Sequence, residues 1–542
     1  MGPPLRRTWK QFLLFRRGRT LAGPREGQIP IPFVSLGSTS PLDKGSRPPE
    51  GKAFGGEQGI GKNREELKKT TTPAQAWALA VGAIIGWGCF VLPGTRFLPD
   101  SGPLAAFIGF IIGGGLMCFI ALCYGILVKV YPVAGGAFAY AYVGLGTKAA
   151  FICGWGLVLS YTCVIAANGT AVALLSRFLL PGVFDVGYLY SIAGWDVYLG
   201  ELLLLSALFV FFAYMNYKGM SCASGIQLIF SLALAAGVAV LAFGSFSTET
   251  ARFDNLYPLF AEDRAAWISV LAVIALGPFL FQGFDTIPQT AEEFNFPPSL
   301  STKLMLYSIV CGGILYILVL LAVASILPYP AMLAQNHPWL TGEVATLSFG
   351  KIGGAILAIP VLAGIFSGMN GYFIASTRLL FSMGRGKFIP SWFEKVHPRH
   401  GTPVNAILFV LMFTLIAPWF GRAALNWLCD TCALGAALSY LFTCITAYKL
   451  AAAYPEMVMR SGRCISLIGV AISLFCFLLL SVPGSPAAIG LESWVMLLVW
   501  VALGVIFYLQ RASELRAIPE REMQFMLLGS SERPLLFGTK AD

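Results

Sequence analysis

The sequence predicts an all-α integral membrane protein with about twelve transmembrane helices. Of its 542 residues, 57% are hydrophobic and 12% are charged, whereas a soluble domain carries about 25% charged residues. Apolar stretches of the length needed to cross a bilayer also recur along the chain. Two of these stretches are interrupted by glycine and proline at their centres, and in lipid a helix breaks only where other groups replace its lost hydrogen bonds.

Each predicted span is an apolar stretch bounded by polar or turn-forming residues. The spans are residues 72–98, 104–128, 149–175, 197–214, 226–243, 267–291, 306–327, 352–381, 403–420, 427–450, 465–482 and 494–509. The eighth is long enough to include a cytoplasmic extension. We therefore divide the chain into a tail (1–70), a ten-helix core (71–450), two additional transmembrane helices (451–510) and a C-terminal cytoplasmic tail (511–542).

The first 70 residues are rich in Gly, Pro, Lys and Arg and contain no apolar core of a signal peptide. Such a composition is typical of a disordered basic tail. A transit peptide is the alternative, because the first 25 residues carry seven Arg or Lys and no acid. The first span would itself serve as the targeting signal, so we expect the plasma membrane, or the inner membrane of a bacterial cell.

Basic residues gather in alternate loops, which orients the spans. The basic set is Lys129, Lys148, Lys218, Lys303, Arg378, Arg385, Lys387, Lys395, Arg399, Lys449, Arg460 and Arg463. These loops and both termini are expected in the cytoplasm. The net charge of +10 is then explained by tails and loops that face a membrane surface, and it predicts no nucleic-acid partner.

The first span contains Gly82, Gly86 and Gly88 within one short stretch, and glycine weakens a helix. A half-helix that starts there would point its N–H groups and positive dipole end at a small anion such as a carboxylate. Close packing of glycine-rich helices is the alternative. A second break at the corresponding place favours the functional interpretation.

The second break lies in the sixth span, between Pro278 and Pro288 and around Gly283. Unwound carbonyls of Phe279 and Gln282 would be acceptors for a substrate ammonium group. The second break comes five spans after the first, so the sixth span crosses in the opposite sense to the first. This spacing predicts two five-span units related by inverted symmetry, with substrate bound between the breaks near the bilayer midplane.

Asp285 is an ionisable residue deep inside that same span, which makes it a functional candidate. It would titrate in a proton-coupled cycle or balance the charge of the substrate ammonium. Alternatively, its carboxylate is bound by N–H groups that the broken helix leaves free. Glu292 and Glu293 lie near the cytoplasmic end and are expected to form a gate or salt bridges.

Four segments, in order, resemble motifs of the amino acid–polyamine–organocation superfamily, in particular its amino acid permeases. Residues 82–93 resemble the first-helix Gly-x-Gly-x-Phe break followed by proline, and residues 281–285 (FQGFD) resemble the sixth-helix motif. Residues 131–136 (YPVAGG) and 378–386 (RLLFSMGRG) are similar to the stretches before the third helix and after the eighth. The likeness extends over roughly residues 70–510.

The resemblance implies a LeuT-type fold of five plus five helices with two extra, and alternating access. It implies a substrate carboxylate held by amides at Gly86, Trp87 and Gly88. It implies an ammonium group held by carbonyls of Ala83, Ile84, Phe279 and Gln282, with Phe279 also an aromatic gate.

Two departures from the family pattern concern specificity and coupling. Trp87 stands where many relatives have a small residue, so it would narrow the site or stack on a cation. Leu234 stands at the position that best matches a lysine of the fifth helix in some relatives. Hydroxyls of the eighth span, including Ser376, could serve a sodium site, so proton and sodium coupling both stay open.

We therefore expect a secondary transporter, either a permease or an exchanger, for amino acids. A transporter of polyamines or other small organic amines is the alternative, and a channel or a nutrient sensor is the alternative of another class. No nucleophile–base pair or complete metal-ligand set appears, so no enzyme activity, cofactor or metal is expected. The outer loop 176–196 has no Cys, so no disulfide-linked heavy subunit is expected.

Overall fold

The computed structural model describes residues 67, 69–192, 194–326, 328–334, 339–485, 487–531 and 533–536. Nearly all of the predicted N-terminal tail lies outside these residues. The described chain is a helical bundle with one two-stranded hairpin, which confirms the predicted all-α membrane class.

Helices make up the described chain almost from end to end. They are α2 (Pro73–Ile85), α3 (Gly88–Leu92), α4 (Leu98–Ser101), α5 (Pro103–Val130), α6 (Ala137–Leu145), α7 (Thr147–Leu179), α8 (Leu199–Lys218), α9 (Met220–Phe246), α10 (Ala266–Ala275), α11 (Gly277–Leu280), α12 (Thr286–Gln289), α13 (Ser301–Ile326), α14 (Tyr329–Ala334), α15 (Leu340–Phe349), α16 (Gly353–Arg385), α17 (Val404–Thr414), α18 (Ala424–Ala453), α19 (Gly462–Ser481), α20 (Leu491–Ala517) and α21 (Glu520–Leu528). The antiparallel strands β1 (Tyr188–Ile192) and β2 (Trp195–Tyr198) lie between α7 and α8.

Eleven helical stretches of the described residues are long and apolar enough to cross a membrane. They correspond to eleven of the twelve predicted spans. The sixth predicted span is present as the short helices α10, α11 and α12. Its interruption around residues 281–285 therefore explains why it is not one of the long apolar helices.

Local sequence sets the start of the first span. Thr72 caps α2: its Oγ1 accepts from the Gln75 amide at 3.3 Å, and its own amide donates to Gln75 Oε1 at 3.0 Å. Proline follows at the first helical position, where its missing N–H costs nothing. This reciprocal cap satisfies N–H groups that a helix otherwise leaves unpaired.

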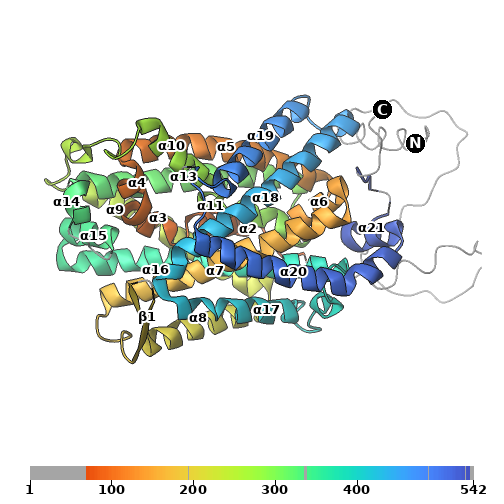
Figure 1. Ribbon diagram of the computed structural model, residues 1–542, viewed down its shortest axis with the longest axis horizontal. Helices are drawn as coiled ribbons and strands as arrows, with labels where there is room; N and C mark the ends of the chain where they lie inside the picture. Colours follow the sequence, from red (N-terminus) through yellow and green to blue (C-terminus); the bar gives the residue numbers. More distant parts are fainter. Residues whose placement is uncertain are drawn as a thin grey trace, which may run out of the picture. The chain divides into compact units, whose positions relative to one another are not determined.

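The broken first span sits inside the bundle. Helix α2 packs against α9, α13 and α16, and α7 packs against α16 and α18. Helix α11 of the sixth span packs against α18, and α12 packs against both α2 and α16. In Figure 1, β1 lies at the left end of the helices and α21 at the right end, with α2 and α7 between them.

Candidate functional site

The first span is broken at Gly86 and Trp87. Helix α2 ends at Ile85, and Gly86 adopts φ +44°, a conformation that favours glycine. The next helix begins where the amides of Phe90 and Val91 donate to the Trp87 carbonyl at 3.1 and 3.2 Å. The Gly86 amide itself donates to the Gly82 carbonyl at 3.1 Å. One of the three amides predicted to bind a substrate carboxylate is therefore already hydrogen-bonded within the protein.

The sixth span is broken between Leu280 and Thr286, where the chain forms successive turns. Gly283 at its centre has φ +134°. A Cβ atom at this position would lie 2.6 Å from the amide nitrogen of Ile84 and 2.9 Å from the carbonyl carbon of Ala83. Only glycine allows this approach, so the two breaks touch, backbone against backbone.

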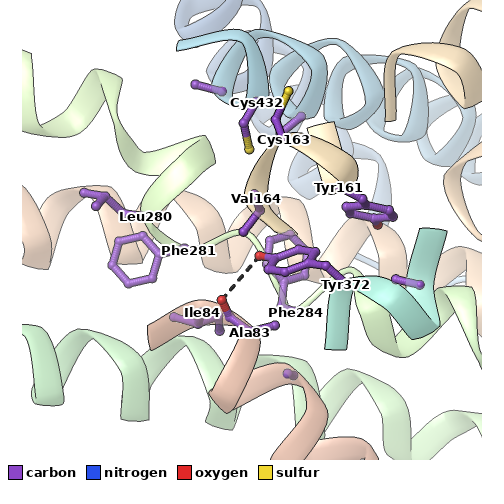
Figure 2. Close-up of a cluster of buried hydrophobic side chains, with 14 of the residues drawn as sticks. Ala83, Ile84, Tyr161, Cys163, Val164, Leu280, Phe281, Phe284, Tyr372 and Cys432 are labelled. Carbon is purple, nitrogen blue, oxygen red and sulfur yellow. Dashed lines mark hydrogen bonds between the residues drawn. The ribbon is translucent and has the colours of Figure 1, made fainter. Parts of the chain in front are cut away.

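Tyrosine hydroxyls engage carbonyls of both breaks. The Tyr372 hydroxyl of α16 lies 2.7 Å from the Gln282 carbonyl oxygen and 3.3 Å from that of Ala83. Figure 2 shows it pointing at Ala83. The Tyr316 hydroxyl of α13 donates to the Ile84 carbonyl at 3.2 Å. Three of the four carbonyls predicted to hold an ammonium group are therefore within hydrogen-bond distance of a tyrosine.

The fourth carbonyl is used within its own turn, because Phe279 accepts from the Gln282 amide at 3.2 Å. The Phe279 ring lies 6.4 Å from the ring of Trp87, centroid to centroid. Trp87 is buried at 2% exposure. The two aromatic residues singled out in the sequence, one from each break, are thus neighbours.

Asp285 is fully buried and accepts two hydrogen bonds. The amide of Gly283 donates to Oδ1 at 2.9 Å, and the Tyr161 hydroxyl of α7 donates to Oδ2 at 2.6 Å. Gln289 in turn donates to the Tyr161 oxygen at 3.3 Å. The carboxylate is bound partly by an N–H group of the broken helix, as the alternative interpretation of this residue predicted.

The Gln282 side chain ties the second break to α7 and α18. Its Nε2 donates to Ser160 Oγ at 2.8 Å, and its Oε1 accepts from Cys432 Sγ at 2.7 Å. Cys432 and Cys163 lie together beside the breaks in Figure 2. Cys432 thus contacts the second break, a contact that its place in the sequence does not reveal.

Buried ion pairs join the end of the sixth span to α16. Arg385 binds Glu292 through both oxygens at 2.9 Å, and Arg378 Nε binds Glu293 Oε1 at 2.8 Å. The Glu293 carbonyl also accepts from the amides of Thr70 and Thr71 at 3.0 and 2.9 Å. The ends of spans one and six are therefore joined to each other and to α16.

The hydroxyl of Ser376 donates to the Tyr372 carbonyl of its own helix at 2.7 Å. Leu234, the position matched to a lysine in some relatives, is fully buried in the apolar core. The residues of α9 that reach span one are instead Gln227 and Ser231, which donate to the Ala78 carbonyl at 3.3 and 2.8 Å. Helix α9 therefore contacts span one through uncharged polar side chains and not through residue 234.

A small pocket lies apart from both breaks, lined among others by Thr170, Trp195, Glu201 and Gly421. Glu201 is ion-paired with Arg177. None of the predicted site residues lines this pocket, so it is not part of the candidate site.

Comparisons with known proteins identify the family of this chain. The profile of the family described as amino acid permease matches residues 72–503. The branched-chain amino acid permease BcaP of Bacillus subtilis is 27% identical over 463 residues, covering 82% of this chain and 93% of its own. The methylthioribose transporter of the same organism is 25% identical over 475 residues with the same coverage. The Asc-type amino acid transporter 1 of Mus musculus is 28% identical over 356 residues, 64% of each chain.

The match covers both broken helices and all but the C-terminal end of the last predicted span. The chain therefore belongs to the amino acid permease family, whose members are multi-pass membrane transporters and not enzymes.

Proposed function

We propose that this protein is a secondary active transporter of amino acids that works by alternating access, with the substrate held between the two broken helices. The observation that carries the proposal is the contact of the breaks, where Gly283 meets the backbone of Ala83 and Ile84. Backbone polar groups that the two interrupted helices do not pair internally meet at one buried point, where lipid offers them no partner and a substrate can provide one.

The substrate carboxylate would be bound at the start of the second half of span one, at Trp87 and Gly88, where helical N–H groups precede the first intrahelical bond. The ammonium group would be bound by the carbonyls of Ala83 and Gln282. The pair Trp87–Phe279 would close one side of the site. An apolar side chain fits these rings better than a charged one.

The ion pairs Arg378–Glu293 and Arg385–Glu292 would form a gate on the cytoplasmic side. They join spans six and eight, and the Glu293 carbonyl joins them to the start of span one. These contacts must separate before a substrate can leave in that direction. The conformation described is then closed at this end. We place the protein in the plasma membrane with both termini in the cytoplasm, and either a proton or sodium as the coupling ion.

A small organic amine is the second candidate substrate. It would rely on Asp285 to balance its charge, but both oxygens of that carboxylate already accept hydrogen bonds. A channel or a sensor would share the fold but not the kinetics. Counterflow of labelled substrate at a saturable rate would exclude both.

The test is a thermal-shift screen of the purified protein against amino acids and their decarboxylated amines, since a ligand that binds only the native state raises its apparent stability. Branched-chain amino acids come first because of the Bacillus relative. We expect a shift with intact amino acids and none with the amines. A shift with amines alone would contradict the assignment of the first break to a carboxylate.

Gly88→Leu provides the matched variant, because a Cβ at residue 88 would lie 2.9 Å from the Tyr316 hydroxyl and 3.1 Å from Leu92. Gly115→Leu is its control, since nothing lies within 4 Å of a Cβ there. The first should lose the ligand-induced shift and the second should keep it. Retention of the full shift by Gly88→Leu would refute the first-break site.

A further inference from the structure

The Tyr372 hydroxyl joins the two broken helices at the point where the proposed site needs a donor. It lies 2.7 Å from the Gln282 carbonyl oxygen of span six and 3.3 Å from the Ala83 carbonyl oxygen of span one. Its side chain is buried at 1% exposure, and Figure 2 shows it between the two breaks. No other tyrosine of the described residues donates to carbonyls of both broken helices.

Other nearby hydroxyls have different partners. The Tyr161 ring lies 5.6 Å from the Tyr372 ring, centroid to centroid, but its hydroxyl donates to Asp285. The Tyr316 hydroxyl contacts the carbonyls of Ile84 and Ile85, both of span one. The bridging position is therefore filled by Tyr372 alone in the described part of the chain.

The physical consequence concerns the empty protein. A buried carbonyl without a donor is costly, and a site built from carbonyls is short of donors whenever the substrate ammonium is absent. The Tyr372 hydroxyl supplies one proton, shared towards both carbonyls, where an ammonium group would supply three. The protein itself thus supplies part of the hydrogen bonding that the carbonyls of the empty site need.

We propose that the Tyr372 hydroxyl takes the place of the substrate ammonium group when the site is empty, and so allows the empty protein to return across the membrane. Resting on the proposed function, this inference assigns the protein to net transport rather than obligatory exchange. A carrier whose empty site is costly to close must return loaded, which gives exchange only. Here the substrate displaces an internal donor, so binding is weakened while empty return is favoured.

The test is Tyr372→Phe, which keeps the ring and removes only the hydroxyl. In proteoliposomes, uptake of radiolabelled leucine is measured into empty vesicles (net transport) and into vesicles preloaded with unlabelled leucine (exchange). We expect net uptake to fall about tenfold, which corresponds to about 1.4 kcal/mol, while exchange stays within about twofold. The KM for exchange should fall, because the ammonium group no longer competes with the hydroxyl.

Tyr140→Phe is the matched control. Tyr140 is also fully buried, and its hydroxyl has no hydrogen-bond partner among the described residues. Both rates should match those of the wild type. A loss of packing at a buried tyrosine would lower exchange and net uptake together.

Three results would overturn the inference: equal losses of net uptake and exchange in Tyr372→Phe, no loss of either, or a raised KM. The last would mean that the hydroxyl and the ammonium group bind together. Each of these leaves the proposed function intact. If the wild type transports none of the proteinogenic amino acids in either assay, the proposed function itself fails.

Discussion

Removing one partner of the Arg378–Glu293 pair should open the end of the protein at which spans one and six meet α16. The two side chains are 2% and 3% exposed and 2.8 Å apart. Arg378→Met leaves the Glu293 carboxylate buried without this partner, and such a loss costs about 3–5 kcal/mol. Opening would return the carboxylate to water, so the opening equilibrium should shift by between about a hundredfold and a few thousandfold.

Hydrogen exchange of the Thr70 and Thr71 amides measures that equilibrium. Both amides donate to the Glu293 carbonyl when the end is closed, so they exchange only after it opens. Mass spectrometry of the peptide that contains them should show exchange faster by the same factor in Arg378→Met. Glu293→Met combined with Arg378→Met should restore most of the protection, because no charge is then left unpaired.

The exposed pair Arg264–Asp263 provides the control. Its side chains are 32% and 64% exposed, and an exposed pair is worth about 0–1 kcal/mol. Arg264→Met should therefore leave the exchange of Thr70 and Thr71 within about fivefold of the wild type. Equal effects of Arg264→Met and Arg378→Met, or a double variant no better protected than the single one, would refute the reasoning.

Three further substitutions test the candidate site itself. Gly283→Ala should abolish substrate binding, because its Cβ would lie 2.6 Å from a backbone nitrogen of the first break. Gly115→Ala is the control and should keep binding, because nothing lies within 4 Å of a Cβ there. Equal binding by both variants in a thermal-shift titration would contradict the contact of the breaks. Trp87→Ser removes the ring whose centroid lies 6.4 Å from that of Phe279, so competition assays should show inhibition by bulkier amino acids. An unchanged range of inhibiting amino acids would mean that Trp87 does not shape the site. Asp285→Asn should flatten the pH dependence of uptake, and an unchanged profile would exclude this carboxylate as the titrating group.

The membrane class and the position of both breaks were predictable because they depend on local properties. Hydropathy over about 20 residues identifies a span, and glycine or proline interrupts a helix wherever it lies. The break at Gly86 and the turns around Gly283 were found where the sequence placed them. The described residues contain eleven long apolar helices where about twelve spans were predicted. The difference follows from the second break, which divides the sixth span into short helices.

The partners of the polar groups could not be predicted, because they come from distant parts of the chain. Tyr372 lies 90 residues from Gln282, Tyr161 lies 124 residues from Asp285, and Tyr316 lies 232 residues from Ile84. A tyrosine in an apolar span gives no local sign of the carbonyl that it will meet. The sequence alone determined that this chain crosses the membrane many times and that two of its helices are broken. Tertiary packing decided which hydroxyls satisfy those breaks, since a hydrogen bond depends on distances of about 3 Å between groups that only the folded chain brings together.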